Sequence, residues 1–132
     1  MKYKKVTWEE VERVVDFFKY IYETRNLEYD YIYGVPRGGL VLATMLSHAI
    51  KIPMLVDVSS KLSDKKILVI DDIADTGNTL NLIKKSIPNS IAFTMYYHQR
   101  SVVEPYTWLF EKTDKWIVYP WEVSYHKDTT LI

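Results

Sequence analysis

The residues best suited to bind a ligand or take part in a reaction are three aspartates that follow a continuous aliphatic run. Asp71 and Asp72 come directly after Ile67–Ile70, and Asp75 stands three residues further along. Adjacent carboxylates at a strand end can accept hydrogen bonds from neighbouring hydroxyl groups, and charge-assisted bonds of this kind are strong. The segment Thr76–Thr79 opens a predicted helix, whose unpaired N–H groups and positive dipole end attract a phosphate. Together these groups favour the binding of a sugar phosphate.

Single residues of this run also have a simpler structural interpretation. Asp72 or Asp75 can start a turn, because aspartate side chains accept hydrogen bonds from nearby backbone N–H groups. Thr76 or Asn78 can cap the helix that follows. The full run is harder to explain in this way, because three carboxylates beside one helix start repel each other without a ligand or metal. Gly77 within the run also allows the backbone to approach a ligand closely.

A second glycine-containing loop, Gly34–Gly39, follows an earlier predicted strand. Arg37 offers a planar fork of donors that suits phosphate oxygens. Gly38 and Gly39 allow consecutive backbone N–H groups to turn toward an anion. Alone, this loop is typical of a surface turn, but its place before the acidic run suggests a second anion site.

The elements that must position these loops alternate between strands and helices, which predicts an α/β fold with a mainly parallel sheet. Ligands of such folds bind at the carboxyl ends of the strands, so both loops should face one crevice. Thr7 and Glu10 form a capping box for the first helix. Helices are predicted over Trp8–Thr24, Leu40–Ala49 and Asn78–Ser86, strands over Tyr29–Tyr33, Pro53–Val58, Lys66–Ile70, Ile91–Tyr97 and Trp116–Val118, and a loop over Asp71–Gly77.

Composition narrows the possible functions. The 132 residues suggest one domain, 1–132, and the 17 basic residues balance the 17 acidic ones. This balance argues against a nucleic-acid partner, because affinity for a phosphate backbone comes from excess lysine and arginine. There is no cysteine, which excludes thiolate metal sites and cysteine nucleophiles. No apolar run approaches the roughly 20 residues that span a bilayer, so we expect a cytoplasmic protein without a membrane partner.

The run from Ile67 to Leu80 resembles the motif with which type I phosphoribosyltransferases bind phosphoribosyl pyrophosphate (PRPP). This resemblance implies a Rossmann-like sheet of about five strands, flanked by helices and completed by a small hood. It implies that Asp71 and Asp72 hold the ribose hydroxyls and lie near Mg²⁺, directly or through water. It also implies that Asp75 deprotonates the base. The implied ribose- and phosphate-binding residues are Asp71, Asp72, Ala74, Asp75, Thr76, Gly77, Asn78 and Thr79.

The resemblance extends to the earlier loop, where Pro36, Arg37, Gly38 and Gly39 would bind pyrophosphate. It implies a cis peptide bond between Pro36 and Arg37. Ser59, Ser60 and Lys61 fall where the family has a flexible loop, which is very short here. No arginine lies between Arg37 and Arg100, so Lys61, Lys65, Lys66 or a neighbouring subunit would replace the loop arginine that the family often has.

The segment Lys115–Glu122, here called the hood, resembles the base-binding part of xanthine–guanine-type members. By this resemblance Trp116 stacks on the purine, Ile117 contacts it through the backbone, and Ile73 adds a further contact. Trp121 is the alternative for the stacking ring or packs the hood against the fold. His98 stands where the family usually has a lysine that contacts the purine 6-oxygen, and Gln99 or Arg100 are alternatives for that contact.

The resemblance therefore predicts a purine phosphoribosyltransferase that joins a 6-oxopurine (guanine, xanthine or hypoxanthine) to PRPP with Mg²⁺, releasing pyrophosphate in purine salvage. It also implies a homo-oligomer, a dimer or tetramer. A non-catalytic sensor of PRPP or nucleotides, or an enzyme for another base, are the alternatives. A phosphoacceptor receiver domain also has paired aspartates at a strand end. Its pair would lie near the start of the domain, whereas Asp71 and Asp72 lie mid-chain.

Overall fold

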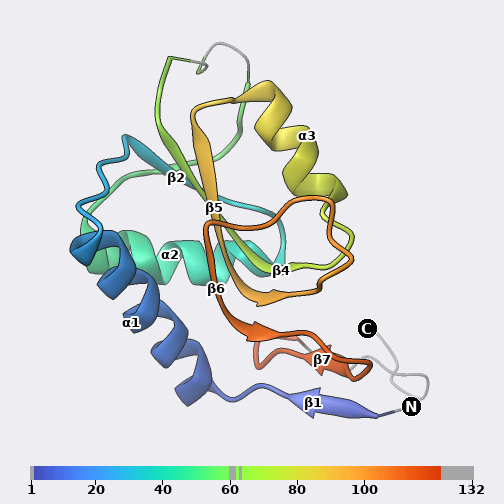
Figure 1. Ribbon diagram of the computed structural model, residues 1–132. Helices are drawn as coiled ribbons and strands as arrows, with labels where there is room; N and C mark the ends of the chain where they lie inside the picture. The colour runs from blue at the N-terminus through green and yellow to red at the C-terminus, as the bar shows by residue number, and fades with distance from the viewer. Residues whose placement is uncertain (1, 60–61, 63, 123–132) are drawn as a thin grey trace, which may run out of the picture.

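The computed structural model describes residues 2–59, 62 and 64–122 (Figure 1). Along the described chain, strands and helices alternate as far as the third strand, and the later elements are strands apart from one helix. None of the helices in this part of the chain is long and apolar enough to cross a membrane. The elements are β1 (Tyr3–Lys5), α1 (Trp8–Thr24), β2 (Tyr31–Gly34), α2 (Gly38–Ile50), β3 (Met54–Leu55), β4 (Ile67–Ala74), α3 (Asn78–Ser86), β5 (Ser90–Tyr97), β6 (Thr107–Glu111) and β7 (Trp116–Val118).

The main sheet has five parallel strands in the order β3-β2-β4-β5-β6. The connection from β2 leads outward to β3, whereas the connection from β4 leads to β5 on the other side. Connections of neighbouring strands therefore diverge between β2 and β4. In open α/β sheets such a divergence opens a crevice at the carboxyl ends of the two strands, where ligands bind.

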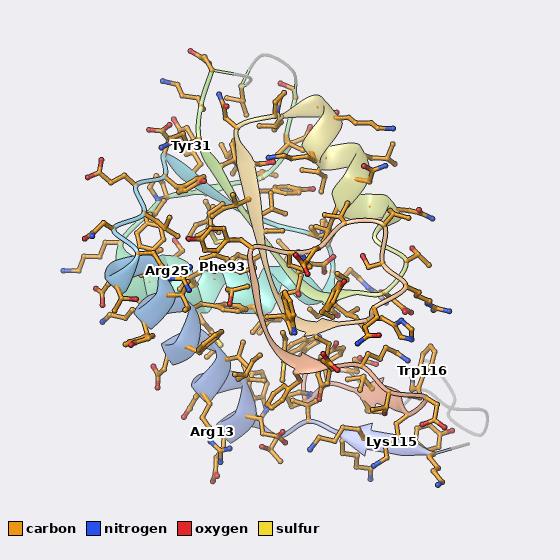
Figure 2. All side chains as sticks on the ribbon, in the orientation of Figure 1. Arg13, Arg25, Tyr31, Phe93, Lys115 and Trp116 are labelled. Carbon is orange, nitrogen blue, oxygen red and sulfur yellow. The ribbon has the colours of Figure 1, made fainter. Side chains whose placement is uncertain are left out.

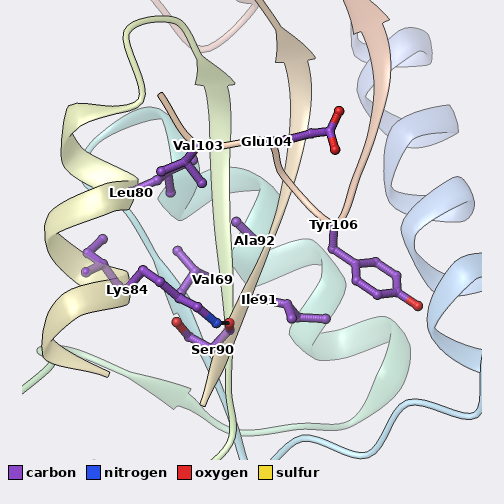
Figure 3. Close-up of a pocket in the computed structure, with 10 residues that line it drawn as sticks. Val69, Leu80, Lys84, Ser90, Ile91, Ala92, Val103, Glu104 and Tyr106 are labelled. Atoms are coloured by element: carbon purple, nitrogen blue, oxygen red, sulfur yellow. Dashed lines mark hydrogen bonds between the residues drawn. The ribbon is translucent and has the colours of Figure 1, made fainter. Parts of the chain in front are cut away.

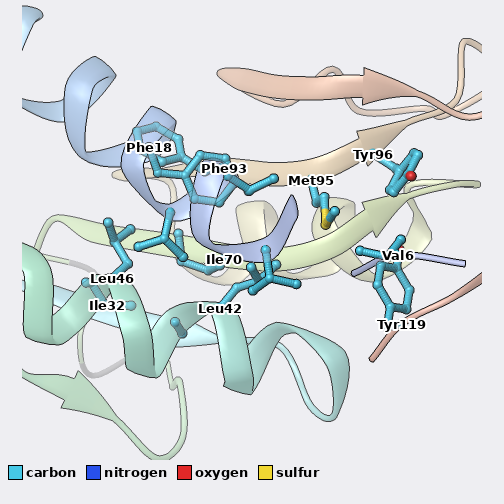
Figure 4. Packing of buried hydrophobic residues seen from close by; sticks show 14 of the residues in the cluster. Val6, Phe18, Ile32, Leu42, Leu46, Ile70, Phe93, Met95, Tyr96 and Tyr119 are labelled. Atoms are coloured by element: carbon cyan, nitrogen blue, oxygen red, sulfur yellow. The ribbon is translucent and has the colours of Figure 1, made fainter. Parts of the chain in front are cut away.

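Helices cover both faces of the sheet, and alternate residues of β4 pack against each of them. Leu68 and Ile70 pack in the core with α1 and α2, which also holds Phe18 and Phe93 (Figure 4). Ile67 and Val69 pack in a smaller core on the α3 side. This two-sided cover explains why β4 begins with an unbroken aliphatic run, as expected for a strand that is buried on both faces.

A second, two-stranded sheet supports the hood. β1 pairs in parallel with β7, and Tyr3 lies opposite Trp116 in the register. The Tyr119 ring stacks on Trp121 at a centroid distance of 4.9 Å, and Trp121 also contacts Trp8 at the start of α1. The Tyr119 hydroxyl donates a hydrogen bond of 3.4 Å to the backbone carbonyl of Asp72. The hood is thus attached both to α1 and to the acidic end of β4.

The sequence-based elements are largely confirmed. The predicted α/β class with a parallel sheet of about five strands is correct, and α1 and α3 have the predicted bounds. The capping box is present, because Thr7 Oγ1 accepts a hydrogen bond from the Glu10 N–H while Glu10 accepts one from the Thr7 N–H. The predicted strand at Pro53–Val58 is reduced to β3, an edge strand that pairs only with β2.

Two predictions about the sheet are wrong. The expected loop Asp71–Gly77 starts too early, because β4 continues to Ala74 and its last residues pair with β5. Trp116–Val118 does form a strand, but it pairs with β1 outside the main sheet. The fifth strand of the main sheet is β6, which the sequence reasoning missed together with β1.

Candidate active site

The two glycine-containing loops meet at the divergence between β2 and β4. The Val35 N–H donates to the Ile70 carbonyl at 2.9 Å, so the chain leaving β2 stays beside β4. Gly38 then lies against the acidic pair, since a Cβ atom at this position would come within 2.0 Å of Asp72 Oδ2. Gly39 lies against the Ile70 carbonyl oxygen, since a Cβ atom at this position would come within 2.4 Å of it. The absence of side chains at both glycines is what allows the loops to share one site.

Asp71 and Asp72 sit where β4 leaves the hydrophobic core. Only 9% of Asp71 is exposed, and its Oδ1 accepts a hydrogen bond of 2.8 Å from the Asp72 N–H. Burial, followed by the neighbouring Asp72 carboxylate, raises the pKa of Asp71 to about 9. Burial also raises the pKa of Asp72. Within the described residues neither carboxylate has an ion-pair partner, so a bound cation or hydroxyl donors would offset their burial.

Thr76–Thr79 forms a compact turn at the end of β4. Together with Asp71 and Ile73–Asp75 it lines a pocket of about 140 Å³. Gly77 has a φ of 80°, and a Cβ atom there would come within 2.3 Å of the Ser101 Oγ. Gly77 is also the N-cap of α3 and has no side chain with which to cap it, but the Thr76 Oγ1 atom accepts a hydrogen bond of 3.3 Å from the Asn78 N–H in the first turn. Asn78 is therefore not the N-cap, whereas the Thr76 side chain does help to cap the helix, and the other N–H groups of the helix start can serve as donors for an anion.

Asp75 forms an ion pair that the sequence reasoning did not predict. Arg100 donates to the Asp75 Oδ1 atom from both Nη2, at 2.7 Å, and Nε, at 3.1 Å. The two residues are 25 positions apart, and no local pattern signals that they meet. The site therefore contains the expected Asp75 carboxylate and, bound to it, the guanidinium of Arg100. The sequence analysis had named Arg100 only as an alternative to His98.

His98 lies at the base of the turn that carries Arg100. Its N–H donates to the Ala74 carbonyl at 2.9 Å, which extends the pairing between β4 and β5. Its ring atom Nδ1 accepts a hydrogen bond of 3.0 Å from the Arg100 N–H. Val102 then donates to the Thr76 carbonyl at 2.8 Å, so the turn after β5 closes onto the turn before α3.

The remaining predicted residues lie at three places. The peptide bond between Pro36 and Arg37 is cis, as expected, and both residues are exposed beside the start of α2. Ser59 is exposed, whereas Ser60 and Lys61 lie outside the described residues. Lys66 precedes β4, and its ammonium lies 5.3 Å from the centroid of the Tyr29 ring. Lys66 is therefore at the opposite end of β4 from the aspartates, and the replacement of a loop arginine by Lys61, Lys65 or Lys66 stays a prediction.

In the hood, the side chains of β7 alternate between exposed and buried positions. Trp116 is 57% exposed, and Figure 2 shows its ring at the outer edge of the molecule. Ile117 is buried in the main core. Trp121 is held between Trp8 and Tyr119, which identifies it as the residue that packs the hood against the fold. Trp116 is therefore the hood tryptophan whose ring remains available for stacking.

A larger pocket lies elsewhere and has a different character. It measures about 240 Å³ and lies between α3, β4 and β5 (Figure 3). Its walls are mainly aliphatic, from residues such as Leu80, Ile83 and Ala92, with Lys84 and Glu104 as charged groups. It contains none of the three aspartates, so the chemical groups point to the smaller pocket rather than to the larger one.

No described group of three or more histidine, cysteine, aspartate or glutamate side chains is arranged to enclose a metal. A divalent cation beside Asp71 and Asp72 would therefore take most of its ligands from a bound molecule and water, as Mg²⁺ usually does. The buried, mutually repelling carboxylates fit such a cation, because its charge would stabilise their ionised forms. The parallel sheet and its acidic crevice place the chain in the class of α/β proteins with ligand sites at diverging strands.

Comparison with known proteins gives the family. Residues 54–128 match the model of the phosphoribosyl transferase domain. The chain is 31% identical over 153 aligned residues to a xanthine-guanine phosphoribosyltransferase from Nitratidesulfovibrio vulgaris strain Hildenborough, with 94% of this chain and 90% of the relative covered. The chain therefore belongs to the phosphoribosyltransferase family.

Other relatives agree with this assignment. A xanthine-guanine phosphoribosyltransferase from Idiomarina loihiensis is 26% identical, over 92% of this chain and 88% of its own. The crystal structure of a purine phosphoribosyltransferase from Pyrococcus horikoshii superposes with a TM-score of 0.78 and 29% identity, covering 93% of this chain and 96% of the other. The five-stranded parallel sheet and its flanking helices thus match the fold of known phosphoribosyltransferases.

Proposed function

We propose that this protein is a purine phosphoribosyltransferase that transfers the phosphoribosyl group of PRPP to a 6-oxopurine. The observation that carries the proposal is the shared position of Asp71, Asp75 and the Thr76–Thr79 turn around one pocket at the end of β4. Carboxylates for sugar hydroxyls and helix donors for a phosphate are thereby presented side by side. The relatives named for xanthine, guanine or purine substrates support a purine as the acceptor.

Each part of PRPP has a counterpart in the site. Asp71 and Asp72 would accept hydrogen bonds from the ribose hydroxyls, and the start of α3 would bind the 5-phosphate. Arg37, Gly38 and Gly39 would bind the pyrophosphate from the neighbouring strand end. Because Gly38 is already in contact range of Asp72, one ligand of this size can bridge both loops.

Mg²⁺ would lie beside Asp72 and Asp71, directly or through water, and would neutralise the negative charge of the leaving pyrophosphate. The protein groups contribute separately from the metal. Arg37 would hold pyrophosphate oxygens with its planar fork of donors. Gly38 and Gly39 would add backbone N–H groups without a side chain in the way.

In the transfer itself, the bond from the anomeric carbon to the pyrophosphate oxygen breaks and a bond to a purine ring nitrogen forms. The anomeric carbon passes through an oxocarbenium-like state, as at other glycosidic centres. The electron pair of the broken bond leaves with pyrophosphate, and the ring proton of the purine passes to the Asp75 carboxylate. Stacking on Trp116 would hold the base in line with the anomeric carbon.

The direct test is to incubate the protein with PRPP and Mg²⁺ and with each of guanine, hypoxanthine, xanthine, adenine and uracil. We expect the nucleoside 5′-monophosphate and pyrophosphate to form with one or more of the three 6-oxopurines. We also expect PRPP with Mg²⁺ to raise the melting temperature. Product formed only from adenine or uracil, or no product from any base, would contradict the proposed function.

A non-catalytic sensor of PRPP or nucleotides is the second candidate. It is favoured by one observation: the Asp75 carboxylate, which would accept the proton, is already paired with Arg100. A sensor would bind PRPP and raise its melting temperature without releasing pyrophosphate on addition of a base. The single-domain organisation and the homo-oligomeric state remain predictions, and sedimentation of the purified protein would test the latter.

A further inference from the structure

Thr94, in the middle of β5, carries a buried hydroxyl group that the fold does not use. The residue is fully buried, and among the described residues its Oγ1 atom has no hydrogen-bond partner. A buried hydroxyl without a partner costs stability, because it gives up its hydrogen bonds to water. Valine has the same branched shape and a high strand propensity without this cost. A threonine at this position therefore calls for an explanation other than packing.

Thr94 and Asp71 lie side by side on the face of the sheet that α3 covers. They are partners in the parallel pairing of β4 with β5. Val69 and Ala92, two positions earlier in the same strands, both line the pocket beneath α3 (Figure 3). Because side chains two positions apart in a strand share one face, Asp71 and Thr94 point to this side as well. Neighbouring strands are about 4.8 Å apart, so a rotated Asp71 carboxylate comes within reach of the hydroxyl.

The other neighbour of Thr94 across the sheet cannot accept its proton. Trp108 pairs with Thr94 from β6, and its ring packs against Tyr97 at a centroid distance of 4.5 Å. An indole N–H is only a donor, whereas a carboxylate offers about four acceptor positions. Asp71 uses one of these, at Oδ1, for the Asp72 N–H at 2.8 Å. Of the two side chains paired with Thr94, Asp71 is thus the one that can accept a hydrogen bond from the hydroxyl.

Building on the proposed function, we propose that Thr94 is a positioning residue for the Asp71 carboxylate. When Asp71 binds the ribose hydroxyls, the Thr94 hydroxyl donates to the carboxylate from the protein side and fixes the orientation of the group. The carboxylate then presents its remaining acceptor positions to the ligand in the pocket that it lines with Thr76–Thr79. Thr94 itself is fully buried and does not touch the ligand. A carboxylate that is held in place loses less freedom on binding, which increases the affinity for the ribose hydroxyls.

The test isolates the recognition of the ribose hydroxyls. Dissociation constants are measured by calorimetry, without metal, for inosine 5′-monophosphate and, by displacement, for its 2′,3′-dideoxy analogue, which lacks both hydroxyls. The ratio of the two constants reports the hydroxyl contacts alone, because the base and the phosphate are the same. The wild type is compared with T94V, T94S and the control T107V. Thr107 is a partly buried threonine of β6 that pairs with Phe93, so it is not beside Asp71.

We expect the wild type and T107V to bind the nucleotide more tightly than the dideoxy analogue. T94V should reduce this preference by roughly 3–10-fold, the value of one hydrogen bond, and T94S, which keeps the hydroxyl, should retain it. An unchanged ratio in T94V, or a T94S ratio as low as that of T94V, would overturn the inference alone. A wild type that binds both ligands equally would overturn it together with the proposed ribose contacts of Asp71 and Asp72, and thus with the proposed function.

Melting temperatures separate this positioning role from a role in the fold. Without ligand, T94V should melt roughly 2–8 °C higher than the wild type, because a methyl group replaces a buried hydroxyl that has no partner. At the same concentration of inosine 5′-monophosphate, T94V should gain less stabilisation than the wild type, since its affinity is lower. A T94V variant that melts below the wild type without ligand would show that the hydroxyl supports the fold, and would overturn the inference.

Discussion

The two halves of β4 lie in the same sheet between the same neighbouring strands, yet the surroundings affect them in opposite ways. Ile67–Ile70 is at most 1% exposed, and burial of these aliphatic side chains stabilises the fold. Asp71 is almost as deeply buried, and there burial raises the pKa of the carboxyl group to about 9. Burial of the first half of β4 thus stabilises the fold, whereas burial of the acidic second half destabilises it. This pattern is expected where a protein retains buried ionisable groups for its function.

The largest expected effect is a loss of activity on substitution of an aspartate at the acidic end of β4. Asp75→Asn keeps the size of the side chain but removes the proton acceptor, so kcat should fall by roughly 10²–10⁴-fold. Steady-state kinetics with hypoxanthine and PRPP measure this. The rise in melting temperature with PRPP and Mg²⁺ should persist, because Asp71 and Asp72 keep the ribose contacts and asparagine at position 75 keeps the backbone N–H beside the phosphate. A kcat within threefold of the wild type would exclude Asp75 as the general base.

Substitutions in the aliphatic half of β4, Ile67–Ile70, should lower the stability of the fold and leave the chemical step unaffected. Leu68 is fully buried, so Leu68→Ala should lower the free energy of unfolding by roughly 2–5 kcal/mol through lost burial and a cavity. Urea denaturation measures this. Leu82→Ala is the matched control, because Leu82 is 66% exposed on α3 and should change stability by about 0.5 kcal/mol or less. Equal effects of the two substitutions would contradict the described burial.

The hood should matter for the base and not for the sugar phosphate. Trp116→Ala should weaken base binding by roughly 1–3 kcal/mol, the value of a base stacked on an aromatic ring. The KM for hypoxanthine measures this, and the KM for PRPP should stay unchanged. Tyr20→Ala serves as the control, since Tyr20 is a similarly exposed ring on α1. A change of both KM values would show that Trp116 supports the structure of the site instead of stacking.

The smallest effect should be a gain in stability at the acidic end. The ordinary pKa of an aspartate is 3.8 and that of Asp71 in the folded protein is about 9, so the folded state holds a proton that the unfolded state has lost. Stability contributed by this group is therefore present at low pH and is lost as the pH rises from about 4 toward 9. Asp71→Asn keeps the acceptor for the Asp72 N–H but cannot ionise.

In EDTA at pH 8, Asp71→Asn should raise the melting temperature by roughly 3–8 °C, and the difference from the wild type should shrink at pH 4. Scanning calorimetry across this range checks the slope. The same variant should lose most of the stabilisation by PRPP and Mg²⁺, since a ribose contact is removed. A variant that is less stable than the wild type at pH 8 would contradict the raised pKa.

How far the sequence predicted the structure depended on how local the determining contacts were. The bounds of α1 followed from its capping box and those of α3 from the polar turn before it, because each signal lies within a few residues of the helix it sets. The end of β4 was misjudged because Asp71–Ala74 stay in the sheet only through pairing with β5. The residue types within β4 do not predict that its last residues pair with β5.

The same reasoning applies to the site. The carboxylates and the glycine turns could be located from their own motif. The contact of Arg100 with Asp75 depends on a turn that His98 anchors to the end of β4 and Val102 to the turn before α3, and residues 25 positions apart carry no joint pattern. β6 was missed because its residues are only half-buried at the edge of the sheet, where alternation is weak.

The pairing of β1 with β7 has a practical consequence for redesign. Lys2 accepts a hydrogen bond of 2.8 Å from the Trp116 N–H, and Tyr3–Lys5 runs alongside Trp116–Val118. β1 contains no group expected to contact a ligand, but its pairing with β7 sets the position of the Trp116 ring, which would stack on the base. Exchanging Tyr3–Lys5 for residues that cannot extend beside β7 should alter which bases are accepted, even though every chemically active group is left in place.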